Sequence, residues 1–217
     1  MRRAAVSERA AVVAIALAAA VGLARAAPRV SPIQIGITTA DIERAIALGR
    51  SPDVAPLQRF HEAYTIPLGD PLLDRLEIIT EFRRVVLGTE DRVRLADITW
   101  GPQQAAAMLG PWRDKVSLVL HVTFSPRNVY YTMPRFDIVL YERPQPQAAG
   151  AIGPIELVET PRYVLGQPAP PGTPILGGLV EATYTARTLD RRGTYLAGIA
   201  FEGRELRRVE IDFSRID

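Results

Sequence analysis

The chain has 217 residues, a formal net charge of +2 and no cysteine. Without thiols it can form neither a disulfide framework nor a cysteine-based metal site, so its stability must come from a packed core. A chain of this length can bury about 70% of the surface that it exposes when unfolded, which suits one domain.

The first 26 residues have the pattern of an export signal. Arg2, Arg3 and Arg9 form a basic start, and an apolar, alanine-rich run covers 10–23. An A-x-A spacing, which a signal peptidase recognises, then ends at Ala26. The sequence therefore predicts a signal peptide, with a periplasmic or secreted location after cleavage near this alanine.

The alternative is an uncleaved membrane anchor. Length weighs against it, because a bilayer-spanning helix needs about 20 apolar residues. Cleavage would leave 22 basic and 23 acidic side chains, an almost neutral chain. Such a chain lacks the basic surface that nucleic-acid binding requires. We therefore expect no nucleic-acid partner, and no transmembrane segment in the mature chain.

Residues 27–110 are predicted to form a helical N-terminal segment. Thr38 or Thr39 can cap a first helix, and Ser51 with Pro52 can start a second. The apolar residues that follow recur at helical spacing. These positions are Ile42, Ala45 and Ile46 in the first helix and Leu57, Phe60 and Tyr64 in the second.

Residues 76–96 are open to two interpretations. Thr80 can cap a third helix, whereas the β-branched residues nearby favour a strand over 76–87. A further helix is predicted over 102–109, because Pro102 suits a first helical position and three alanines favour helix.

From residue 111 onward the pattern changes to that of strands. A hydrophobic period of two begins at Lys115. It places Val116, Leu118, Leu120, Val122 and Phe124 on one face. Further strands are predicted over 136–141, 155–159, 180–187, 195–201 and 206–213, the last two as a hairpin around Glu202 and Gly203.

Five or six antiparallel strands result. The sequence therefore predicts an α+β fold, in which short N-terminal helices pack with an antiparallel β-sandwich or open barrel over 111–217 as one domain.

The two histidines give little support for catalysis. Thr65 stands where a zinc-protease helix would need a second histidine after His61, so no metal is expected, nor any other cofactor. His121 and Ser125 would lie about 13 Å apart on an extended strand, too far for a nucleophile and its base. His121 is expected to hydrogen-bond across the sheet instead.

Glu210 and Asp212 provide the enzymatic alternative. They project to one face of the last strand about 7 Å apart. This pattern would suit a metal-independent extracytoplasmic hydrolase that uses paired carboxylates. Arg208 shares their face, so a solvated surface with salt bridges is the simpler interpretation.

A binding hypothesis rests on a cluster in the connection that follows residue 124. Planar and hydrogen-bonding side chains of this kind are typical of contact surfaces. They are Arg127, Asn128, Tyr130, Tyr131 and Arg135. If Val129, Tyr131 and Met133 face inward, then Tyr130 and Thr132 face outward with the arginines, and form a rim that suits an acidic or sugar-like partner. Strand propensity offers a purely structural explanation of the tyrosines.

These patterns together predict an exported, noncatalytic, β-rich module. It would bind a protein or carbohydrate partner in the cell envelope, or serve envelope structure.

Overall fold

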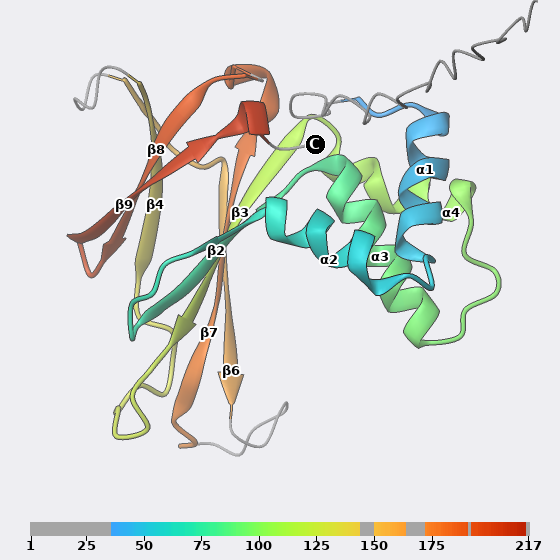
Figure 1. The fold of residues 1–217 in the computed structure, drawn as a ribbon. Coiled ribbons are helices and arrows are strands. Elements are labelled where there is room, and N and C mark those ends of the chain that lie inside the picture. The colour runs from blue at the N-terminus through green and yellow to red at the C-terminus, as the bar shows by residue number, and fades with distance from the viewer. Residues whose placement is uncertain (1–35, 144–149, 164–171, 191, 216–217) are drawn as a thin grey trace, which may run out of the picture.

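The computed structural model describes residues 36–143, 150–163, 172–190 and 192–215. The predicted signal peptide lies outside these residues. Four helices and two antiparallel sheets are described, with the helices in the N-terminal half (Figure 1). The predicted α+β class is therefore confirmed.

Each helix begins where a local signal allows it. Thr38 forms a capping box with Asp41, and Thr80 Oγ1 accepts from Arg83 N at 3.2 Å. The helices are α1 (Thr39–Gly49), α2 (Val54–Ala63), α3 (Glu81–Arg94) and α4 (Pro102–Leu109). The prediction that Ser51 and Pro52 start the second helix is wrong, because Asp53 provides the cap and accepts from Ala55 N at 3.1 Å.

Both interpretations of residues 76–96 are partly correct. The β-branched residues at the start belong to β2 (Leu73–Ile79), and Thr80 separates this strand from α3. The segment predicted as helical thus also contains strands, since β1 (Thr65–Pro67) pairs with β2.

The strands form two separate sheets. The five-stranded sheet has the order β1-β2-β3-β7-β6, and the four-stranded sheet has the order β5-β4-β8-β9. The remaining strands are β3 (Lys115–Thr123), β4 (Phe136–Glu142), β5 (Ala151–Ile152), β6 (Glu156–Tyr163), β7 (Ile175–Thr185), β8 (Thr194–Phe201) and β9 (Arg204–Asp212). These nine strands exceed the five or six predicted, because β1 and β2 lie in the helical half and β5 has only two residues.

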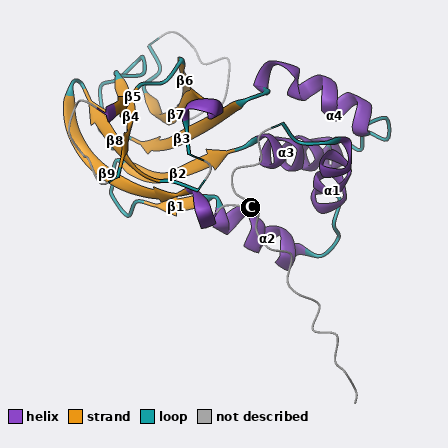
Figure 2. Ribbon diagram, turned by 90° about the horizontal axis from the view of Figure 1, so that it is seen from above, coloured by secondary structure: helices purple, strands orange, loops and turns teal. Residues whose placement is uncertain are grey.

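The main core lies between the two sheets. The predicted apolar face of β3, from Val116 to Phe124, is buried there with the inner residues of β4, β7, β8 and β9. The predicted hairpin is also present, and Glu202 and Gly203 both have positive φ at its turn. Figure 2 shows two open layers of strands with the helices gathered at one side.

The helices form a second core of their own, and they cover part of the outer face of the five-stranded sheet. α1, α3 and α4 supply most of the residues buried in this core. Arg84 of α3 reaches the sheet and donates to Ser117 Oγ at 3.0 Å and to Glu181 at 2.9 Å. At the other end of the same face, Thr123, Arg162 and Leu179 are exposed. In the described part of the chain, no helix has the length and apolarity that a bilayer crossing demands.

Candidate functional site

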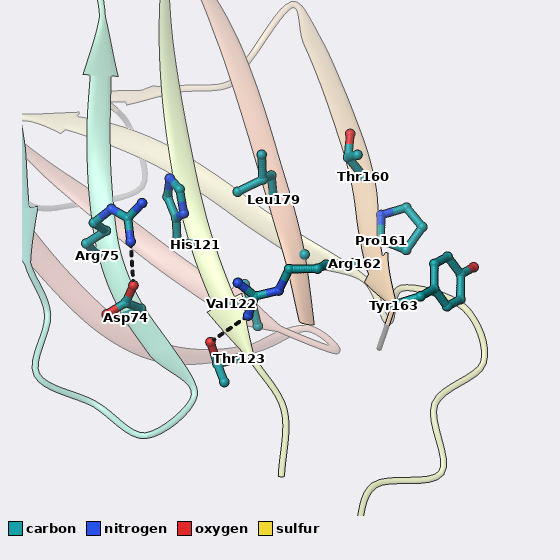
Figure 3. Close-up of a pocket in the computed structure, with 11 residues that line it drawn as sticks. Asp74, Arg75, His121, Val122, Thr123, Thr160, Pro161, Arg162, Tyr163 and Leu179 are labelled. Atoms are coloured by element: carbon teal, nitrogen blue, oxygen red, sulfur yellow. Dashed lines mark hydrogen bonds and ion pairs between the residues drawn. The ribbon is translucent and has the colours of Figure 1, made fainter. Parts of the chain in front are cut away.

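A hollow of about 400 Å³ lies on the exposed end of this outer face (Figure 3). Its volume falls within the range of small-molecule sites. Residues of β2, β3, β6 and β7 line it, and we call it the sheet hollow. They are Asp74, Arg75, His121, Val122, Thr123, Thr160, Pro161, Arg162, Tyr163, Gly178 and Leu179.

A glycine in β7 lies beside the sheet hollow. The strand register places Gly177 between Thr123 and Arg162, so the three positions form one row. Gly177 has a φ of 151°, and an added Cβ would lie 2.0 Å from the carbonyl oxygen of Val122. The middle of the row therefore cannot carry a side chain. Arg162 extends across this gap, and its Nη2 donates to Thr123 Oγ1 at 3.3 Å (Figure 3).

A charged network around Glu77 forms the side of the sheet hollow that lies opposite Arg162. Glu77 Oε1 lies 2.8 Å from His121 Nε2 and accepts from Arg75 Nε at 2.8 Å, and its Oε2 accepts from Arg83 Nη2 at 2.7 Å. The hydrogen bond from His121, with help from both arginines, lowers the pKa of Glu77 to about 2 against the opposing effect of burial. Glu77 thus stays ionised at ordinary pH and fixes the positions of its three partners.

The sheet hollow combines this fixed polar side with an apolar one. Arg75 is further paired with Asp74 at 2.6 Å. Across the sheet, Leu179 has 37% of its surface exposed, and Pro161 also lines the hollow. Such a mixture of apolar wall and oriented polar groups is typical of sites that bind a small ligand.

The predicted binding cluster is divided by the structure. Asn128 and Tyr130 stabilise the connection between β3 and β4. Asn128 Nδ2 donates to the carbonyl oxygens of Ser125 and Ile175 at 2.7 and 3.0 Å, and Tyr130 N donates to Asn128 Oδ1 at 2.8 Å. The Tyr130 ring packs against Phe124, with centroids 5.0 Å apart.

The other three members of the cluster lie at the surface. Arg127 is exposed, Tyr131 is 54% exposed, and the largely exposed Arg135 pairs with Asp137 at 3.2 Å. The expected alternation is wrong at three positions, since Tyr130 faces the core whereas Val129 and Tyr131 are exposed. The reason is that residues 124–135 form an irregular connection and not a strand.

The paired carboxylates of β9 are engaged with arginines. Arg143 lies 2.7 Å from Glu210 and Arg215 lies 2.9 Å from Asp212. Both acids border a smaller hollow of about 190 Å³. A hydrogen bond from Ser214 is the main reason why the pKa of Asp212 lies below its usual value. A general acid requires the opposite shift.

Each of the two histidines contacts a glutamate side chain. His121 hydrogen-bonds to Glu77 on the neighbouring strand, as predicted, and Ser125 Oγ accepts from Arg127 N at 3.3 Å. His61 lies 3.0 Å from Glu90. Within the described residues, no group of three or more acidic or histidine side chains is placed to hold a metal ion.

Sequence reasoning missed the residues that build the sheet hollow. Arg75 and Glu77 lie on β2, His121 lies on β3 and Arg162 lies on β6, and only the strand register brings these residues together. One local signal was present, because the adjacent glycines at 177 and 178 interrupt an otherwise apolar strand.

The chain matches no protein-family model, no curated protein and no solved structure at a significant level. Its function therefore has to be inferred from the chemistry of the site.

Proposed function

We propose that this chain is an exported, noncatalytic module that binds a small, partly apolar ligand in the sheet hollow. The observation that carries the proposal is the sheet hollow itself, with its volume of about 400 Å³. Arg162 lines one side of it, and Arg75 and His121, the partners of Glu77, line the other. Leu179 supplies apolar surface in the same hollow. The ligand would come from the cell envelope or its surroundings.

Filling the sheet hollow tests this proposal. We expect Leu179→Arg to weaken the binding of small fluorinated aromatic fragments at least tenfold, a loss of about 1.4 kcal/mol, because the longer side chain occupies the ligand's space. The measurement is fragment binding by fluorine NMR to the purified chain.

Leu206→Arg is the matched control. Leu206 is 40% exposed, close to the 37% of Leu179, but it lies on β9 of the other sheet. Its replacement should leave the same dissociation constants within about twofold. Equal affinities in both variants and the unchanged chain would contradict the proposed site.

The proposed export leads to a separate expectation. When the full chain is produced in a Gram-negative bacterium, we expect the periplasmic product to begin at Ala27, because the A-x-A spacing precedes this residue. Mass spectrometry of the intact product measures its first residue. A cytosolic product that retains Met1 would refute export.

A further inference from the structure

We propose that the sheet hollow selects ligands that carry an anionic oxygen group, a carboxylate or a phosphate, beside an apolar body, and that Arg162 binds this group. The inference rests on the proposed function and adds the chemical class of the ligand.

Two arginines line the sheet hollow, Arg75 and Arg162, and they differ in their interaction partners. Arg75 contacts two carboxylates, Asp74 at 2.6 Å and Glu77 at 2.8 Å. Arg162 differs, because its guanidinium donates to the neutral hydroxyl of Thr123 at 3.3 Å and pairs with no carboxylate among the described residues. A guanidinium has five N–H donors, and this bond engages one of them. Within the described part of the chain, Arg162 thus has capacity for an incoming anion.

The second step concerns the position of Arg162. Its guanidinium lies across the gap at Gly177, between β6 and β3, and the Thr123 hydroxyl restrains it there (Figure 3). An arginine that is already oriented loses less conformational entropy when it forms paired hydrogen bonds to a carboxylate or phosphate. Thr123 is therefore a positioning residue for Arg162.

The third step concerns the remainder of the ligand. Leu179 lines the sheet hollow together with Arg162, and it is more than one-third exposed. An apolar group attached to the anion would cover this surface and gain its burial. It would also exclude water from the ion pair, which strengthens the attraction.

The fourth step concerns cationic ligands. The carboxylates near the sheet hollow, Asp74 and Glu77, already contact arginines, and Glu77 has three cationic or hydrogen-bonding partners. A cationic ligand would have to compete with these contacts. An anion at Arg162 displaces no acidic group of the described residues.

Three matched probes test the inference on the full chain. They are 4-fluorophenylacetate, 4-fluorophenyl phosphate and the neutral 4-fluorophenylacetamide, with binding followed by fluorine NMR. We expect at least one anion to bind tenfold or more tightly than the amide. A preference between the two anions identifies the carboxylate or the phosphate as the natural group.

Variants then assign the selectivity to a residue. Arg162→Gln should weaken the preferred anion at least tenfold and change amide binding less than twofold. Thr123→Val should weaken the anion three- to fivefold, because Arg162 loses its restraint. Arg127→Gln removes an exposed arginine from the β3–β4 connection and should change neither affinity.

Two results would overturn the inference. If the amide and both anions bind equally and Leu179→Arg abolishes all three, the sheet hollow is a site without charge selection and the proposed function stands. If Arg127→Gln and not Arg162→Gln removes the preference for anions, the anion binds at the β3–β4 connection and both proposals fail.

Discussion

Replacing Glu81 with alanine is expected to lower the free energy of unfolding by about 4 kcal/mol, because a buried carboxylate and the four groups that share it lose their contacts. The Glu81 side chain is 1% exposed. Its carboxylate accepts from the backbone N–H groups of Gly36 and Ile37 at 3.1 and 3.2 Å, and from Asp114 N at 2.8 Å. Arg113 adds an ion pair at 3.1 Å.

This carboxylate joins three parts of the fold. Gly36 and Ile37 precede α1, Glu81 starts α3, and Asp114 leads into β3. Its removal leaves three N–H groups without their acceptor and Arg113 without a counter-charge. The loss should therefore loosen the helices from the sheet as well as lower global stability.

Urea denaturation measures the effect. Glu43→Ala, at an exposed position of α1, is the matched control and should cost less than about 0.5 kcal/mol. Glu81→Gln keeps one acceptor oxygen, so its loss of unfolding free energy should fall between those of Glu81→Ala and Glu43→Ala. A loss below about 1 kcal/mol for Glu81→Ala would show that these contacts contribute little to stability.

Arg83→Met should cost about 3 kcal/mol, because it removes a buried cation whose partners stay buried. Only 3% of the Arg83 side chain is exposed. Its Nη1 donates to the carbonyl oxygens of Tyr64 and Ile78, both at 2.9 Å, while Nη2 binds Glu77. Methionine fills most of the volume but donates no hydrogen bond, so the two carbonyl groups each lose a donor.

Arg94→Met is the control for this change, because Arg94 lies on the same helix with 72% of its side chain exposed. Its replacement should alter stability by less than about 0.5 kcal/mol. Thermal and urea unfolding of both variants give the comparison. Equal stabilities for the two variants would mean that the Arg83 contacts are not stabilising.

Local patterns were sufficient for much of the fold. The period of two in β3 correctly placed its buried face, and Thr38 and Thr80 correctly marked two helix starts. These predictions succeeded because alternation and capping depend on residues close in sequence. β2 was ambiguous, since a short apolar run fits either a buried strand or a helix until its neighbours are known.

The candidate site depended on information that is not local. Tyr130 was assigned to the wrong side because the alternation rule was applied to a connection that is not a strand. Thr123, Gly177 and Arg162 are far apart in sequence, and only the pairing of β3, β7 and β6 aligns them. Strand register over such separations cannot be read from hydrophobic periodicity.

The most direct test of the binding site is a map of backbone amide shifts during titration with 4-fluorophenylacetate. Binding in the sheet hollow predicts that the largest changes occur at Thr123, Arg162 and Leu179, with smaller changes at residues 127–135. Changes centred on residues 127–135, or on Glu210 and Asp212, would contradict the assignment of the ligand to the sheet hollow.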